Sequence, residues 1–320
     1  MIRDIVASRD CALANRLRLI AHRQLVRWGA IVAAGQATVE TMNTELLDIA
    51  RTVALAAAEL ASRRRREGVS IADHKSSPVD VVTLADRETE ALIRGMLADA
   101  RPSDGFFGEE SGAEKGSSGL TWVVDPIDGT VNYLYGIPHY GVSIAVVEGE
   151  PDPLTWTGLA GCVVNPAIGE VFTATTDGGA FLGDTSIAVA PAVDLSQALV
   201  GTGFAYDSAM RGVQGELIAK LLPGVRDIRR AGTASLDLCF VACGRLNAYF
   251  ERTLSPWDHA AGAIIARAAG ARVSGRNGEA PSRDFILAAE PSVATALENR
   301  LNELDTRMGD LARSMHADRV

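Results

Sequence analysis

The sequence has no apolar run of the ~18 residues that a membrane-spanning helix needs, and it has too little positive charge to bind nucleic acid broadly. Its 31 Lys and Arg residues are outnumbered by 40 Asp and Glu residues, which leaves a formal net charge of -9. Nucleic-acid affinity comes largely from cations that displace counterions along the phosphate backbone. We therefore expect neither membrane association nor a nucleic-acid partner. The acidic balance does suit divalent cations.

Cysteine is scarce as well, with four residues at Cys11, Cys162, Cys239 and Cys243. No spacing among them matches a zinc-binding pattern, and the last two fall on one face of a predicted helix. Reduced, structural thiols are therefore expected. The apolar part of the N-terminus is short and follows a broken charged region, which does not suit an export signal. A cytoplasmic location is the expectation.

The 320 residues, 47% of them hydrophobic, are enough for one large layered domain or two closely packed ones. Residues 1–43 form an N-terminal extension of unknown role, 44–195 a first α+β part and 196–320 a second α/β part. Helical apolar spacing predicts helices at 44–66, 86–99, 208–221, 234–244, 257–270 and 291–313. Apolar runs predict strands at 106–108, 122–124, 139–148, 158–164, 170–176 and 248–250, and the strands after 138 suggest a largely antiparallel sheet. Residues 112–119 are predicted as a flexible segment.

One stretch runs from a buried apolar strand into two carboxylates, a glycine and a hydroxyl: Asp125, Asp128, Gly129 and Thr130. Pro126 fixes its own backbone and holds Asp125 extended, so the chain turns at once and both carboxylates point toward one place. Gly129 has access to backbone angles closed to other residues, and with Thr130 it offers N–H groups to an anion. The stretch predicts a metal site beside a phosphate site.

Acidic residues stand at the ends of several predicted elements: Asp86, Glu109, Asp125, Asp128 and Asp258. Mg²⁺ prefers oxygen ligands, and sites that hold two ions for phosphoryl transfer need several shared carboxylates. Taken alone, Asp86 and Asp258 each also fit a helix N-cap. Together the five predict a magnesium site for phosphoryl transfer.

Four motifs, in order, resemble those of the inositol monophosphatase family of metal-dependent, lithium-sensitive phosphatases. They are Lys75–Pro78 continued through Asp86, Gly108–Glu110, Asp125–Thr130 and Trp257–Gly262. The resemblance covers about residues 44–310. It implies an αβαβα sandwich and a homodimer.

The resemblance also implies two or three Mg²⁺ ions per site. The ligands that it implies are Asp86, Glu109, Asp125, the carbonyl of Ile127, Asp128 and Asp258. The catalytic residues that it implies are Glu109, Thr130 and Asp128, of which Glu109 and Thr130 orient the attacking water. The implied substrate contacts are Gly129, Thr130, Asp128, Gly232, Thr233, Ala234 and Glu251.

The implied activity is hydrolysis of myo-inositol monophosphate to inositol and phosphate by metal-activated water. Related phosphatases that act on histidinol phosphate, fructose 1,6-bisphosphate or 3'-phosphoadenosine 5'-phosphate share the metal motifs and stay open as alternatives. An alternative from another class is a regulatory module that binds RNA or a protein, against which the carboxylate set and the acidic charge argue. Glu251 also fits a plain strand-end charge. Arg229 and Arg230 fit a surface or structural role, with contact to a second phosphate or to a partner surface as the alternative.

Overall fold

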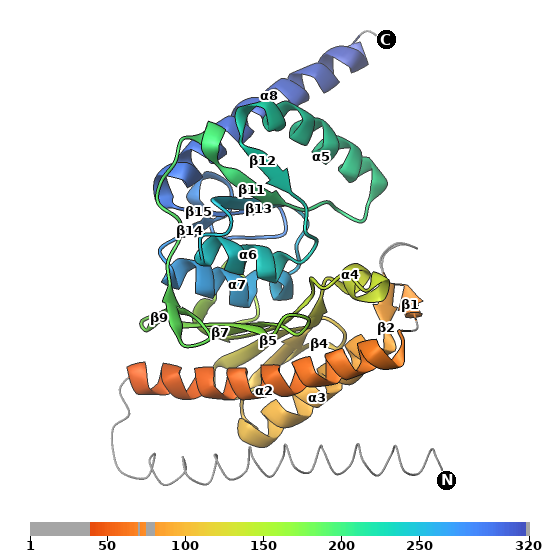
Figure 1. Ribbon diagram of the computed structural model, residues 1–320, viewed down its shortest axis with the longest axis vertical. Helices are drawn as coiled ribbons and strands as arrows, with labels where there is room; N and C mark the ends of the chain where they lie inside the picture. Colours follow the sequence, from red (N-terminus) through yellow and green to blue (C-terminus); the bar gives the residue numbers. More distant parts are fainter. Residues whose placement is uncertain (1–38, 70, 75–80, 318–320) are drawn as a thin grey trace.

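The computed structural model describes residues 39–317 apart from 70 and 75–80 (Figure 1). The predicted extension up to residue 38, Cys11 and the motif Lys75–Pro78 lie outside the described residues. The first described helix, α2 (Val39–Glu67), begins earlier than the predicted start at residue 44. No helix in the described ranges is long and apolar enough to span a membrane.

The larger of the two main sheets has eight strands in the described chain, in the order β10-β9-β8-β7-β6-β5-β3-β4. Their bounds are β3 Gly105–Gly108, β4 Gly112–Glu114, β5 Leu120–Asp128, β6 Gly141–Glu148, β7 Thr157–Asn165, β8 Glu170–Thr175, β9 Gly179–Leu182 and β10 Thr185–Ile187. All neighbours are antiparallel except β3 and β5. The antiparallel sheet was predicted correctly. The prediction of a flexible 112–119 was partly wrong, because 112–114 pairs with β3 across a tight turn.

Strand β5 is buried on both faces, and its side chains alternate between two cores. Trp122 and Val124 pack toward α2 and α3 (Leu84–Ala100), while Val123 belongs to the core shared with α6 (Ala234–Ala242) and α7 (Pro256–Ala268). This explains the continuous apolar run, because a strand covered on both faces needs no polar side.

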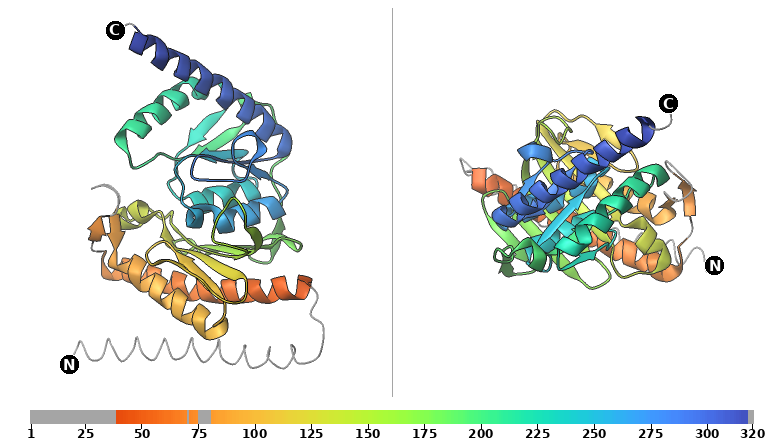
Figure 2. Two further views of the ribbon diagram at one scale, coloured as in Figure 1. Left: turned by 180° about the vertical axis from the view of Figure 1, so that it is seen from behind. Right: turned by 90° about the horizontal axis from the view of Figure 1, so that it is seen from above.

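A smaller sheet has five strands in the described residues, in the order β12-β11-β13-β15-β14. Their bounds are β11 Leu199–Thr202, β12 Asp227–Arg229, β13 Ala248–Glu251, β14 Arg272–Ser274 and β15 Ile286–Ala289. Helices α5 (Ser208–Leu221) and α8 (Pro291–Ala317) cover its outer face, and α6 and α7 lie between the two sheets (Figures 1 and 2). The chain is therefore an αβαβα sandwich, as predicted. The division at residue 195 stays a prediction.

The remaining elements are short. They are the paired strands β1 (Ile71–His74) and β2 (Val81–Thr83), helix α4 (Thr130–Tyr135), and the 3-10 turns η1 Leu195–Gln197, η2 Leu222–Gly224 and η3 Arg276–Gly278. Helix α4 follows β5 directly, at the edge of the space between the layers (Figure 1).

Candidate active site

The end of β5 delivers the two central carboxylates. Pairing with β6 is irregular between Asp125 and Asp128, where Pro126 has no N–H to donate. Gly129 then adopts a left-handed backbone (φ 89°) and precedes the first residue of α4. A Cβ at this position would lie 2.4 Å from the Thr233 hydroxyl, so only glycine fits. The sharp turn predicted after the strand is therefore present.

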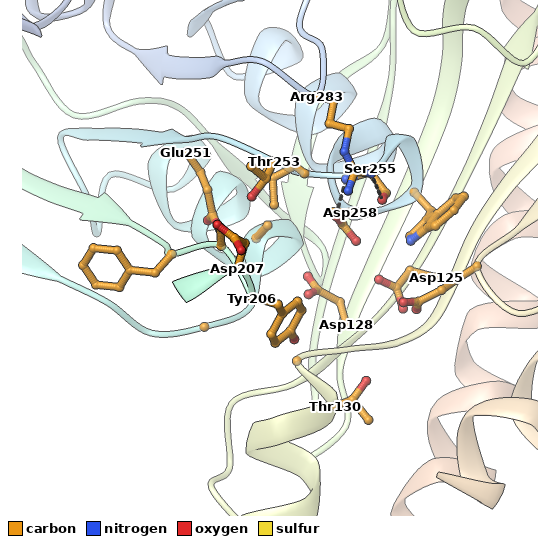
Figure 3. A pocket seen from close by; sticks show the side chains of 18 of the residues that line it. Asp125, Asp128, Thr130, Tyr206, Asp207, Glu251, Thr253, Ser255, Asp258 and Arg283 are labelled. Atoms are coloured by element: carbon orange, nitrogen blue, oxygen red, sulfur yellow. Dashed lines mark hydrogen bonds between the residues drawn. The ribbon is translucent and has the colours of Figure 1, made fainter. Parts of the chain in front are cut away.

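Main-chain N–H groups hold one oxygen of each of three carboxylates. Asp125 Oδ1 accepts from the N–H of Ile127 at 3.0 Å. Asp128 Oδ2 accepts from the N–H of Ser235 at 2.7 Å, at the start of α6. Asp258 Oδ2 accepts from the N–H of Ser255 at 2.6 Å. One oxygen of each side chain is thus fixed, which orients the second oxygen as a ligand for a cation. The three side chains point toward a common space (Figure 3).

Asp86 and Asp258 are not N-caps, which corrects that reading of the sequence. Thr83 caps α3 and Ser255 caps α7, and the two aspartates stand at the third helical position of a capping box. Asp86 Oδ2 accepts from the N–H of Thr83 at 2.8 Å. Asp86 Oδ1 accepts from the Thr130 hydroxyl at 3.2 Å, so Asp86 lies behind Thr130.

Glu109 reaches the site from β3. Its N–H donates to the carbonyl of Val124 at 3.2 Å, which places Glu109 beside Asp125. The following N–H, that of Glu110, donates to Glu90 Oε2 at 2.8 Å. Glu90 is 3% exposed and was missed by sequence reasoning, although its place one helical turn after Asp86 puts it on the same buried face. We infer that Glu90 positions the Glu109 turn.

The carboxylates share a buried environment that disfavours negative charge. Burial raises the pKa of Asp86 and that of Asp128 to about 7. Burial, followed by the charge of Glu109, raises the pKa of Asp125 and of Asp258 well above the usual range. Negative charges held this close favour either protons or a cation among them.

These residues fit a hard divalent cation. Within the described part of the chain, no three His, Cys, Asp or Glu side chains are already closed into a metal-binding cluster. The donors at the cavity are nevertheless carboxylate oxygens and the Ile127 carbonyl, which are the ligand types that Mg²⁺ prefers. A divalent ion would neutralise the charge that burial disfavours. Glu109, Asp125, Asp128 and Asp258 are the residues that would hold it.

A cavity of about 800 Å³ lies over these carboxylates. Of the predicted site residues, those that line it are Glu109, Asp125, Ile127, Asp128, Gly129, Thr130, Gly232, Ala234, Glu251 and Asp258. Asp86 and Thr233 are fully buried behind this lining; the Thr233 hydroxyl donates to the carbonyl of His139 at 2.9 Å. Asn132, on α4, holds the turn at residues 232–234, which was predicted to contact the substrate, because its amide nitrogen donates to the carbonyl of Ala231 at 2.8 Å.

Sequence reasoning missed several lining residues that come from the second half of the chain: Tyr206, Asp207, Arg211, Thr253 and Arg283. They lie in loops or at a helix start, and no motif marks them. Figure 3 shows Tyr206 and Asp207 on the side of Glu251, and Arg283 on the side of Asp258.

The layered fold and the carboxylate-lined cavity define a phosphatase of the metal-dependent sandwich class. The model of the inositol monophosphatase family matches residues 42–308, and the chain belongs to this family. An inositol-1-monophosphatase of Mycobacterium leprae is 46% identical over 235 residues, which are 70% of this chain and 78% of the relative. A Xylella fastidiosa protein named Nus factor SuhB is 41% identical, over 70% of this chain and 82% of that protein.

Solved structures agree with this assignment. The extragenic suppressor protein suhB from Bartonella henselae matches with a TM-score of 0.73 at 32% identity, over 80% of this chain and 98% of that one. The protein is thus a phosphatase whose fold and family are those predicted from the motifs.

Proposed function

We propose that the protein is a Mg²⁺-dependent phosphomonoesterase whose substrate is myo-inositol monophosphate, hydrolysed to inositol and phosphate. One observation carries the proposal: Asp125, Asp128 and Asp258, from two separate elements, meet at one cavity with an oxygen of each held by a main-chain N–H. Such pre-oriented carboxylates support a metal site better than mobile ones, because little reorganisation is needed on binding.

In this proposal two or three Mg²⁺ ions would activate water and neutralise the charge that develops on the phosphate and on the leaving oxygen. Glu109 and the Thr130 hydroxyl orient the water, and the N–H groups of Gly129 and Thr130 take the phosphate. The water oxygen bonds to phosphorus, the bond from phosphorus to the alcohol oxygen breaks, and a proton passes to that oxygen. Glu251, in the wall of the same cavity, accepts hydrogen bonds from substrate hydroxyls.

The test is phosphate release from inositol monophosphate, with and without Mg²⁺, by the wild type and by Asp128→Asn. We expect this variant to lose about 100-fold or more in kcat/KM, because a shared ligand oxygen is replaced by an amide. Asp184→Asn, in an exposed turn between β9 and β10, is the matched control and should keep full activity. Near wild-type turnover by Asp128→Asn at saturating Mg²⁺ would reject the site.

The substrate panel should include histidinol phosphate, fructose 1,6-bisphosphate and 3'-phosphoadenosine 5'-phosphate, because phosphatases for these compounds share the metal motifs. Lithium inhibition, a homodimer and a cytoplasmic location are parts of the same proposal, and they are supported by the family resemblance and the cysteine usage.

A second candidate function is regulatory, because two relatives carry the name Nus factor SuhB. In that reading the fold would bind RNA or a protein, and catalysis would be secondary. If no compound of the phosphate panel is hydrolysed while Mg²⁺ binding is retained, this candidate is favoured over the phosphatase proposal.

A further inference from the structure

A second cavity lies between helix α7 and residues 149–156, which connect β6 to β7. Its volume is about 400 Å³, within the range of roughly 300–1,000 Å³ for small-molecule sites. No residue lines both this cavity and the cavity over the carboxylates. The second cavity is therefore a separate candidate site.

Most of the lining of the second cavity is apolar. Helix α7 contributes Ile264 and the small side chains of Ala260 and Ala263. The connection between the strands contributes Leu154, which is 58% exposed, and the half-buried indole of Trp156. An exposed leucine and an indole beside a hollow favour a ligand with an apolar or aromatic body.

One buried polar atom in this lining has no partner. His259 is 2% exposed, and its Nε2 forms no hydrogen bond with any described residue. The centre of its ring lies 6.5 Å from that of Trp156, so the imidazole neighbours the indole. A buried nitrogen without a partner costs free energy, which a ligand that bonds to it would recover. A hydroxyl suits this nitrogen because it can donate or accept, whichever ring nitrogen of the histidine carries the proton.

A cation lies further along the same helix. Arg267, in the last turn of α7, is exposed and lines the second cavity, and its Nη2 donates to the carbonyl of Val273 at 3.2 Å. No described Asp or Glu forms an ion pair with Arg267. Side chains on a helix lean toward its N-terminus, which is the direction of His259. The second cavity thus offers a positive charge at its exposed part and an unpaired polar atom at its buried part.

We propose that the second cavity binds a small aromatic carboxylate with a hydroxyl at the far end of its ring. The guanidinium of Arg267 pairs with the carboxylate, because its parallel N–H donors match two carboxylate oxygens. The ring packs on Trp156 and Ile264, and the hydroxyl bonds to His259 Nε2. The inference goes beyond the proposed phosphatase function, since it uses no residue of the cavity over the carboxylates.

The test measures the binding of three probe compounds by titration calorimetry: 3-(4-hydroxyphenyl)propionate, 3-phenylpropionate, which lacks the hydroxyl, and 3-(4-hydroxyphenyl)propionamide, which lacks the charge. Mg²⁺ and inorganic phosphate are present throughout to occupy the cavity over the carboxylates. We expect the hydroxylated carboxylate to bind with a dissociation constant of about 10–100 μM, an ordinary efficiency for a ligand of this size. Loss of the hydroxyl should weaken binding about 3- to 10-fold, and loss of the charge about tenfold or more.

Substitutions locate the two polar contacts. Arg267→Gln should weaken binding of both carboxylates about tenfold and leave the amide unchanged, because only the charge-assisted contact is lost. Arg94→Gln, on α3 and outside the lining, is the matched control and should bind like the wild type. His259→Phe should abolish the preference for the hydroxyl and keep the binding of 3-phenylpropionate. If His259→Phe does not fold, the comparison of the three compounds on the wild type still tests the hydroxyl contact.

Dissociation constants above about 1 mM for all three compounds, or equal affinities for all three, would overturn the inference. So would binding that is lost in Asp128→Asn, because that result would place the ligand in the cavity over the carboxylates. Binding that Asp128→Asn retains supports the second cavity. Since the measurement does not use hydrolysis, its failure is distinct from a failure of the phosphatase proposal.

Discussion

The protein without divalent cations should become less stable as the pH rises from about 4 to about 7. Asp86 carries this prediction most clearly, because it is 0% exposed and burial raises its pKa from 3.8 to about 7, with Glu109 and Glu110 adding to the rise. The folded state therefore keeps a proton that the unfolded chain releases. The resulting stability is complete below pH 3.8 and is lost as the pH rises through about 7.

The size of the effect follows from the shift. A change of about three pKa units, at ~1.4 kcal/mol each, corresponds to a loss of up to about 4 kcal/mol in the free energy of unfolding from Asp86 alone. The pKa values of Asp128 and Glu251 are also raised to about 7, so they act in the same direction. Mg²⁺ should restore stability at pH 7, since the ion supplies the neutralising charge.

The measurement is urea unfolding at pH 5, 6 and 7, in metal-free buffer and with Mg²⁺. Asp86→Asn should make the metal-free pH profile less steep, because an amide does not ionise and only the contributions of the other buried carboxyls remain. Asp184→Asn should follow the wild type. Metal-free stability that is constant or rises from pH 5 to pH 7 would refute the reasoning. So would an Asp86→Asn profile parallel to that of the wild type.

Two further substitutions test how the site is held. Gly129→Ala should lower the free energy of unfolding by about 1–2 kcal/mol because of the left-handed backbone, and by more because of the contact with Thr233. Gly169→Ala, at φ 72° in open space, should lower it only by the backbone contribution. Equal unfolding free energies of the two variants would contradict the close approach of Gly129 to Thr233. Tyr133→Phe removes a buried hydroxyl that donates to the carbonyl of Ala61 at 2.8 Å and should cost about 1–3 kcal/mol. Tyr135→Phe, 76% exposed, should leave the melting temperature nearly unchanged, and an equal effect of both changes would argue against that hydrogen bond.

The carboxylates at the end of β5 and the start of α7 were predictable because local sequence patterns mark them. Asp125 and Asp128 end an apolar strand at a proline, and Asp258 opens a helix after Pro256, so each carboxylate has a signal within a few residues. Even so, the capping residues were misjudged, because Thr83 and Ser255 are as good as aspartate at a helix start.

The arginines that line the cavity over the carboxylates were not predictable in the same way. Arg211 opens no motif, and Arg283 lies in a loop before β15 whose position depends on the packing of the second sheet. Arg230 stands beside a recognisable turn, yet nothing local distinguishes it from Arg229. Only the tertiary structure shows that one of them pairs with Asp227 and the other lines the cavity.

The close packing of α7 on β7 has a consequence for the metal site. A Cβ at Gly161 would lie 2.9 Å from the carbonyl oxygen of Ala261, and one at Gly158 would lie 2.6 Å from Ile264. Any side chain there would push α7 outward and carry Asp258 away from Asp125. The distance between Asp125 and Asp258 is therefore set partly by Gly158 and Gly161. Their side chains are single hydrogen atoms, and their strand supplies none of the predicted metal ligands.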